Sequence, residues 1–107
     1  MSDTLSITNP WTGALADSYS LDSPEAVDGK VLAAHEATAQ WRKVPLGLRI
    51  ELVERFLVVA EANKEDVAGL ISRQMGKPVR EARNEVGAMI GLARTMIRLA
   101  PEALADQ

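Results

Sequence analysis

The chain has 107 residues, of which 47% are hydrophobic, so it is long enough for one domain with one modest core. Its formal net charge is -3 with acids and bases interspersed, so we expect neither nucleic acid nor a membrane surface as a partner. The absence of cysteine excludes disulfides, thiolate metal sites and a cysteine nucleophile within the chain.

The N-terminal residues lack the basic start and the apolar run of a secretory leader. No segment approaches the ~20 consecutive apolar residues that a membrane-spanning helix needs. We therefore expect a cytoplasmic protein.

Residues 5–21 are predicted to form a β-ribbon. Apolar and polar residues alternate over 5–8 and again over 14–21, and Asn9, Pro10 and Gly13 between them are typical of a turn. Two strands alone are marginal in water, so we expect the ribbon to lie on helices or to pair with other strands.

Four helical segments are predicted between residues 24 and 100, which makes the fold class mostly α with a short N-terminal β-ribbon. Ser23 is placed to cap the first helix, with Pro24 at its first position. An apolar stripe then runs from Val27 to Trp41. The second helix follows Pro45 and has a wide apolar face, which we expect to be well buried.

The third helix is predicted to begin at Asn63, with Asp66 three residues later as an imperfect capping box. Gly76 ends it. The fourth helix carries apolar residues at intervals of three and four from Pro78 onward. Pro101 disfavours the helical conformation of the residue before it, so we expect this helix to end at residue 100.

The triplet Gly76-Lys77-Pro78 interrupts this helical pattern and admits two interpretations. A phosphate-binding loop of nucleotide hydrolases needs a glycine five residues before the Gly-Lys pair and a Ser or Thr after it. Those positions hold Ile71 and Pro78. Glycine past a helix end and proline opening the next helix are typical of a corner, which is the interpretation that we favour.

Titratable residues offer two candidate sites, a pair of glutamates and a single histidine. Glu81 and Glu85 could form a carboxylate pair, but no histidine or third carboxylate lies at ligand spacing, and we favour a solvated helix face. His35 has no Cys, Ser or Asp constellation around it, so we favour a solvated histidine. We assign neither catalytic residues nor metal ligands to this chain.

A basic cluster is predicted around the Gly76 corner, beside the positive end of the fourth helix, where an anion could bind. Its members are Arg73, Lys77, Arg80 and Arg83. Basic clusters of this size are ordinary at helix ends, and we favour solvated side chains.

The large apolar side chains have simpler expected roles. Met75, Met89 and Met96 lie on or near inward stripes, where core filling is the simplest role. Trp11 and Trp41 are expected to anchor packing, with an interface role as the alternative.

The order and spacing of these motifs resemble the N-terminal portion of an aldehyde dehydrogenase. The resemblance rests on an Ile-x-Asn-Pro-x-Thr-Gly opening at residues 7–13, the Ser-capped helix ending in Trp41, and the segment from Pro45 to Arg49. Met75-Gly76-Lys77-Pro78, followed by Glu81-Ala82 and Glu85-Val86, completes it. The residues around Gly76 most resemble those of the succinate-semialdehyde dehydrogenases.

The resemblance implies that the chain is the N-terminal fragment of an α/β fold whose NAD-binding core and catalytic domain are not present in it. It implies NAD or NADP as cofactor of the complete enzyme, with no cofactor-binding residue in this chain. The expected partner is the remainder of the enzyme chain, in a homo-oligomer when complete. A chain without cysteine cannot supply the thiolate for aldehyde oxidation, so alone it is expected to be inactive.

Residue by residue, the resemblance implies that Met89 and Leu92 face the substrate tunnel, while Gly76, Lys77 and Pro78 form a structural turn. For both tunnel residues the core remains the favoured alternative. Arg49 is expected to bond carbonyls near a helix start, and Lys77 those that end the third helix.

Two functions stay open from the sequence. The first is a fragment of an aldehyde dehydrogenase, and the second is a free-standing helical module that binds a partner without catalysis. No capping residue or closing strand follows residue 101, which favours the first.

Overall fold

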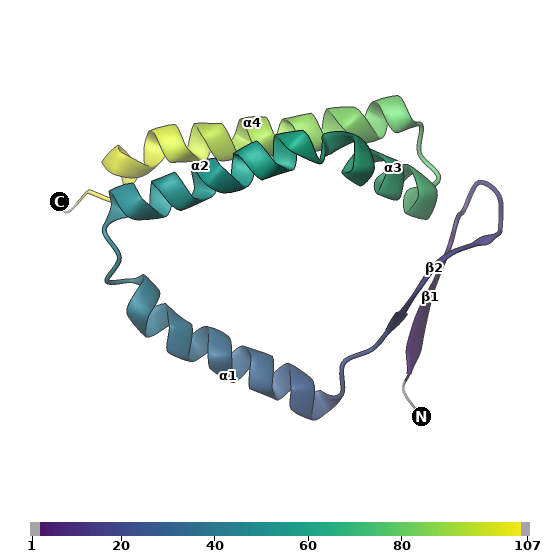
Figure 1. The fold of residues 1–107 in the computed structure, drawn as a ribbon, viewed down its shortest axis with the longest axis horizontal. Coiled ribbons are helices and arrows are strands. Elements are labelled where there is room, and N and C mark those ends of the chain that lie inside the picture. The colour runs from purple at the N-terminus through teal and green to yellow at the C-terminus, as the bar shows by residue number, and fades with distance from the viewer. Residues whose placement is uncertain (1–2, 106–107) are drawn as a thin grey trace.

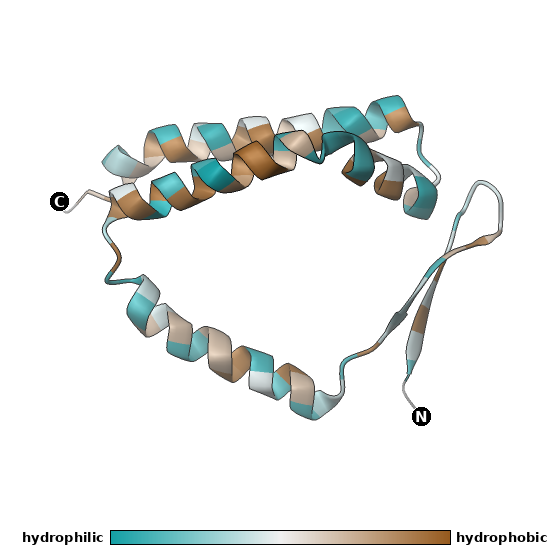
Figure 2. Cartoon of the chain, viewed as in Figure 1, coloured by the Kyte–Doolittle hydropathy of each residue, from teal (hydrophilic) through white to brown (hydrophobic). Residues whose placement is uncertain are grey.

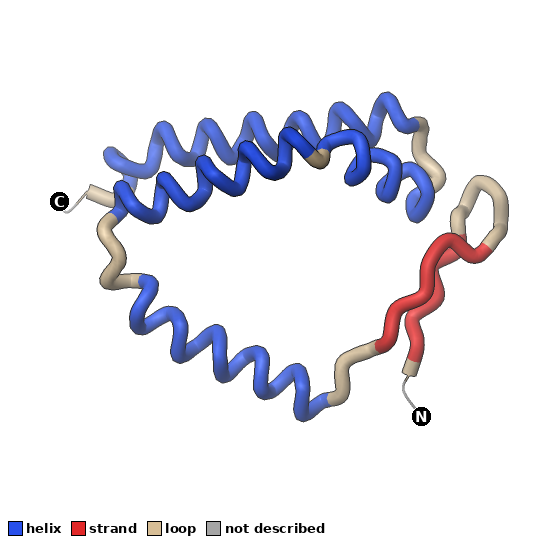
Figure 3. The backbone as a smooth tube through the Cα atoms, viewed as in Figure 1, coloured by secondary structure: helices blue, strands red, loops and turns tan. Residues whose placement is uncertain are grey.

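The computed structural model describes residues 3–105 and consists of a two-stranded ribbon followed by four helices (Figure 1). The elements in chain order are β1 (Thr4–Thr8), β2 (Leu15–Ser20), α1 (Pro24–Trp41), α2 (Leu46–Ala62), α3 (Lys64–Met75) and α4 (Val79–Ala103). The tube view shows the strands at one end of the molecule and the helices forming the rest (Figure 3). The predicted mostly helical class with an N-terminal ribbon is confirmed.

The ribbon is antiparallel, with Leu5 opposite Tyr19 and a register shift between Ile7 and Thr8. Its turn is closed by Asn9, whose side-chain Oδ1 accepts the backbone N–H of Trp11 at 2.8 Å. Gly13 completes the turn with a φ of 72°, a conformation that only glycine adopts without strain.

Helices α2, α3 and α4 pack together, and α4 lies along both of the others (Figure 1). Their core is small, because five hydrophobic residues are buried in the described part of the chain: Leu57, Ala68, Ala82, Val86 and Ile90. The largest fully buried side chain is that of Ile90 on α4. The molecule therefore has a three-helix core with modest apolar burial.

Helix α1 stands apart from this core. Ser23 caps it as predicted, because its hydroxyl accepts the N–H of Ala26 at 3.2 Å. No residue of α1 is buried, and its stripe from Val27 to Trp41 is exposed. Figure 2 shows apolar positions scattered along this separated helix.

The prediction that α2 is well buried is wrong. Leu57 is its one buried residue, and Phe56 is 56% exposed. The apolar face of α2 is wide, but α3 and α4 cover only one edge of it.

Asn63 occupies the predicted N-cap position of α3, but its side chain does not cap the helix. The Asn63 side chain accepts no hydrogen bond from the first turn of α3. It donates through Nδ2 to the carbonyl of Val59 at 2.8 Å, which satisfies an acceptor at the end of α2. A single residue, Asn63, thus connects α2 to α3, and its side chain bonds to α2.

Helix α4 continues through Pro101 to Ala103, past the predicted end at residue 100. Proline lacks the N–H that would bond the carbonyl four residues earlier, which is Ile97. The chain continues through one more turn nonetheless, and Leu104 donates to the carbonyl of Ala100 at 2.9 Å. The steric preference for ending at the residue before proline is therefore overridden here.

The large apolar side chains are less buried than the sequence led us to expect. Trp11 is 85% exposed at the tip of the ribbon, and Trp41 is exposed at the end of α1. Met75, Met89 and Met96 are exposed as well, so core filling is not their role in this structure. Among residues 3–105, no helix combines the length and the apolar composition that crossing a membrane requires.

Candidate functional site

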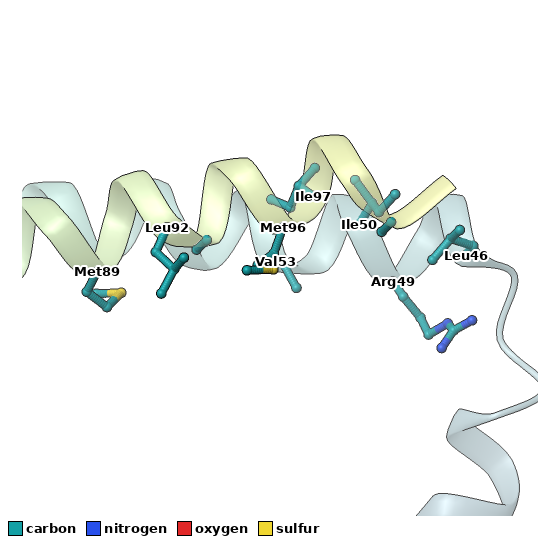
Figure 4. Close-up of a pocket in the computed structure, with 10 residues that line it drawn as sticks. Leu46, Arg49, Ile50, Val53, Met89, Leu92, Met96 and Ile97 are labelled. Atoms are coloured by element: carbon teal, nitrogen blue, oxygen red, sulfur yellow. The ribbon is translucent and has the colours of Figure 1, made fainter. Parts of the chain in front are cut away.

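An apolar groove of about 470 Å³ runs between α2 and α4 (Figure 4). Its lining residues are Leu46, Arg49, Ile50 and Val53 from α2, and Met89, Leu92, Ala93, Met96, Ile97 and Ala100 from α4. On both helices these residues recur at three and four, so each contributes one continuous stripe. The groove is therefore a direct product of the helical periodicity.

Met89 and Leu92 lie together on this groove, pointing away from the helix axis in the same direction (Figure 4). Both side chains are exposed. The favoured alternative, an ordinary core position for each, is therefore wrong. Their place is suited to contact an apolar ligand or another protein segment. Of the α2 residues opposite them, Arg49 was singled out from the sequence for a structural role, and Ile50 and Val53 belong to the apolar face expected there, but none was assigned to a site.

Arg49 is the one charged residue among the side chains lining the groove. Its Nε is buried and has no hydrogen-bond partner within the described residues. The expected bond from this group to carbonyls near the helix start is absent there, and that prediction is wrong for Nε. An unpaired donor on an apolar groove favours an occupant that brings an acceptor.

A second hollow of about 520 Å³ adjoins the groove along α2, α3 and α4. Phe56, Val67 and Ile71 line it, and Met89 belongs to both hollows. One apolar face therefore extends along most of the length of α2 and α4.

The Gly76 corner is confirmed. Gly76 ends α3 with a φ of 69°, and its N–H bonds the carbonyl of Ser72 at 2.9 Å. The chain then passes through Lys77 and Pro78 into α4. The Ser72 hydroxyl donates to the Lys77 carbonyl at 2.7 Å, which holds the turn from inside.

The ribbon turn packs directly on this corner, so the ribbon lies on helices, which is one of the two arrangements expected for it. A Cβ placed on Gly76 would lie 2.9 Å from Cγ of Pro10 and 3.1 Å from the backbone nitrogen of Trp11. Gly76 therefore permits both the left-handed backbone and the close approach of the ribbon.

The basic cluster is not free to bind an anion, because each of its cations faces a carboxylate. Arg80 pairs with Glu81 at 3.2 Å, and Arg83 pairs with Glu65 at 2.8 Å. Lys77 pairs with Glu85 at 2.6 Å, so the prediction that its ammonium caps the end of α3 is wrong. The fourth member, Arg73, contacts the ribbon.

Arg73 and Gln74 of α3 together hold Asp17 of β2. The Arg73 guanidinium donates to both carboxylate oxygens at 3.0 Å, and Gln74 Nε2 donates to Oδ2 at 3.0 Å and to the Tyr19 hydroxyl at 2.9 Å. The hydrogen bond from Gln74 and then those from Arg73 lower the pKa of Asp17 against the opposing effect of desolvation. We call this set of contacts the ribbon clasp.

The other titratable candidates, Glu81, Glu85 and His35, lie on the surface. Glu81 and Glu85 each contact a basic side chain on an exposed helix face, as favoured above. His35 is exposed on α1. No group of three or more potential metal-ligating side chains was found among residues 3–105.

Comparison with known proteins gives consistent results. The family model described as "Aldehyde dehydrogenase family" matches residues 1–107. The chain is similar to 3-sulfolactaldehyde dehydrogenase of Pseudomonas putida, with 38% identity over 86 residues, which are 79% of this chain and 18% of the relative.

Two further relatives are similar to the chain. N-succinylglutamate 5-semialdehyde dehydrogenase of Burkholderia ambifaria is 41% identical over 81 residues, covering 76% of this chain and 17% of its own length. A probable aldehyde dehydrogenase of Pseudomonas sp is 33% identical over 107 residues, covering 99% of this chain and 22% of its own length. The chain thus spans about a fifth of the length of these relatives. Since the family model matches it throughout, this chain belongs to the aldehyde dehydrogenase family.

Proposed function

We propose that this chain serves as the N-terminal part of an NAD(P)-dependent enzyme that oxidises an aldehyde to the carboxylic acid. The family match over residues 1–107 carries the proposal. The catalytic cysteine and the residues that bind NAD or NADP come from the rest of such an enzyme, since a chain without cysteine holds no thiolate nucleophile.

Within that enzyme, the role of this chain is to form part of the substrate-binding region. Met89 and Leu92 form one wall of the tunnel through which the aldehyde reaches the reacting cysteine. Their joint exposure on an apolar groove supports this role, because a flexible thioether and a leucine make a smooth apolar surface. Lys77 and Pro78 act structurally, with Gly76, by holding α3 and α4 at the corner.

The substrate that we propose first is succinate semialdehyde, which carries an acidic group remote from the aldehyde. Two relatives are named for aldehydes that also carry acidic groups, 3-sulfolactaldehyde and N-succinylglutamate 5-semialdehyde. The complete enzyme is proposed to be a cytoplasmic homo-oligomer.

A chimera tests the function. The chain replaces the aligned segment of the probable aldehyde dehydrogenase of Pseudomonas sp, which it matches over 99% of its length. We expect aldehyde-dependent reduction of NAD or NADP, measured by absorbance, and its loss when the catalytic cysteine of the added portion is replaced. A well-folded chimera without activity would contradict the proposal.

Met89→Ala in the active chimera tests the tunnel role. We expect kcat/KM to change unequally across a series of aldehydes of different length, with the KM for cofactor unchanged, because the side chain meets the substrate. Met75→Ala is the matched control, since Met75 is an exposed methionine outside the groove. Equal effects of Met89→Ala on every aldehyde would remove the residue from the tunnel.

The second candidate function is a helical module that binds a partner without catalysis. The exposed apolar face of α2 and α4 favours it, because such a face is typical of interaction surfaces. It predicts that the chimera folds and stays inactive while residues 1–107 alone retain a binding partner.

A further inference from the structure

The groove between α2 and α4 is longer than a small aldehyde. Its α4 side rises about 17 Å from Met89 to Ala100, at 1.5 Å per residue. Succinate semialdehyde measures only about 4 Å between its terminal carbons, at ~1.5 Å per C–C bond. Figure 4 shows Met89 near one end of the groove and Arg49, with Leu46 and Ile50, at the other. We call these three residues the Arg49 end, and a substrate that lies against Met89 does not reach it.

The Arg49 end carries a positive charge that the described chain does not neutralise. Within residues 3–105, the guanidinium of Arg49 forms neither a hydrogen bond nor an ion pair, and its Nε is buried. The cations of the corner differ, because Arg73, Lys77, Arg80 and Arg83 each pair with a carboxylate. A buried donor without an acceptor destabilises the structure that holds it. Arg49 therefore lacks a partner that these other cations have.

The start of α2 adds to this positive charge. The first N–H groups of a helix have no acceptor within the helix and carry a partial positive charge. Pro45 caps α2 without a side-chain hydrogen bond, and the first turn of α2 contains no acidic residue. Each of the other three helices has at least one acidic residue in its first turn. A carboxylate at this place would bind both the guanidinium and the start of the helix.

The rest of the enzyme is the partner that the size of the chain favours. The chain exposes 8437 Å², whereas a compact protein of 11.6 kDa exposes about 5,800 Å². The Pseudomonas sp relative aligns with 99% of this chain through only 22% of its own length, so most of that relative lies outside the alignment. The aligned relatives thus contain enough further chain to cover the open surface.

We propose that the rest of the enzyme docks on the Arg49 end and presents to it the carboxylate of an acidic side chain. The carboxylate pairs with the guanidinium of Arg49 and compensates the start of α2. Arg49 is then a positioning residue, which fixes the groove relative to the catalytic part and does not touch the substrate. This inference rests on the proposed function, because it requires the enzyme of which the chain is a part.

Arg49→Met tests the proposal through a change of sign between two proteins, residues 1–107 alone and the chimera described above. In the chain alone, the substitution removes an unpaired buried donor, so we expect an unchanged or higher Tm. In the chimera it leaves the partner's carboxylate unpaired, so we expect the Tm to fall by about 2 °C or more. Thermal unfolding followed by circular dichroism measures both. A fall in the chain alone, or no fall in the chimera, would overturn the proposal.

Two further variants separate Nε from charge in general. Arg55→Met is the matched control, because Arg55 is an exposed arginine of α2 outside the groove, and we expect no change of sign. Arg49→Lys keeps the charge but lacks Nε and the planar fork, so we expect it to recover only part of the loss in the chimera. Full recovery by lysine would overturn the role of Nε. Failure of only the Arg49→Met chimera to fold is the extreme form of the expected loss.

Other occupants of the Arg49 end give different results. If a second copy of the chain bound there, Arg49→Met would lower the Tm of the chain alone at high concentration and not at low concentration. If the substrate's own acidic group bound there, Arg49→Met in the active chimera would lower kcat/KM for aldehydes with a remote carboxylate and spare those without one. Either result would overturn the proposal.

The stability measurement is independent of catalysis. A folded chimera that is inactive contradicts the proposed function, whereas the effect of Arg49→Met on its Tm still reports docking. An active chimera in which Arg49→Met leaves the Tm unchanged overturns the docking role alone. The two proposals therefore fail in different measurements.

Discussion

Gly76 meets two demands at one position, a left-handed backbone and a close neighbour. Its φ is 69°, and Cγ of Pro10 lies 2.9 Å from where a Cβ would be. Gly13 has a similar φ of 72° with no atom within 4 Å of the same position. Substitutions at Gly76 and Gly13 therefore allow the cost of a left-handed conformation to be measured separately from the cost of a steric clash with a neighbour.

We expect Gly76→Val to destabilise the chain by more than the ~1–2 kcal/mol that a left-handed conformation costs, because the ribbon must also move. Gly13→Val is the control, and we expect it to cost only the conformational part. Urea unfolding of both variants gives the comparison. Equal losses would show that the contact between Gly76 and Pro10 contributes nothing.

Asp17 makes docking of the ribbon dependent on pH. Its pKa is lowered from the ordinary value of 3.8, first by the Gln74 hydrogen bond and then by Arg73, so folding favours the ionised carboxylate. The stabilisation is complete above the ordinary pKa and is lost as the pH falls through the lower folded value.

We expect acidification below about pH 3.8 to release the ribbon, and Asp17→Asn to remove this dependence. The NMR signal of the Trp11 backbone amide reports the release, because this nitrogen lies 3.1 Å from the position of a Cβ on Gly76. An Asp17→Asn chain with the same acid transition as the parent would show that other carboxylates control it.

At the scale of elements, α4 organises the fold through a few residues. It supplies Ala82, Val86 and Ile90, which are three of the buried residues in the described chain. Ile90 is 1% exposed and belongs to the cluster with Leu57 of α2. A core this small has little redundancy.

We expect Ile90→Ala to cost about 2–5 kcal/mol, which removes much of the stability of such a core. Val58→Ala on α2 is the control, because Val58 is 70% exposed, and we expect a change within about 0.5 kcal/mol. Thermal or urea unfolding measures both. A small effect of Ile90→Ala would mean that the three helices associate by other contacts.

Local signals predicted the elements well, because caps, turns and periodicity act over a few residues. Ser23, Gly13 and Gly76 each specify their own backbone geometry, and the structure has them as predicted. Burial was predicted poorly, since a wide apolar face such as that of α2 indicates that something covers it without indicating what.

The candidate site shows the same division. Periodicity places Met89 on a stripe with its neighbours, but the facing residues come from α2 and depend on how the helices pack. The clasp between Asp17 and Arg73 joins residues 56 positions apart, and no local pattern announces such a pair. Asn63 was misassigned because an asparagine between two helices can bond either one.

At the scale of the whole molecule, α1 and the three-helix core are expected to differ in stability. Helix α1 buries no residue, and most helical stability in proteins comes from tertiary packing of an apolar face. In the dilute monomer we expect its amides to exchange with deuterium faster than those of α4 around Ile90. Equal protection of the two helices in the monomer would contradict an open α1.

The clasp between β2 and α3 closes a long loop that contains all of α1 and α2. Helices α1 and α2 and the short turn between them separate the ribbon from α3 along the chain. Their length and geometry set the effective concentration of the ribbon at α3. Loop-closure entropy depends only logarithmically on length, at about 0.6 kcal/mol per doubling. Insertions before α1 are therefore tolerated as long as Asp17 still reaches Arg73, and this stretch is where the chain can vary in length without losing its ribbon.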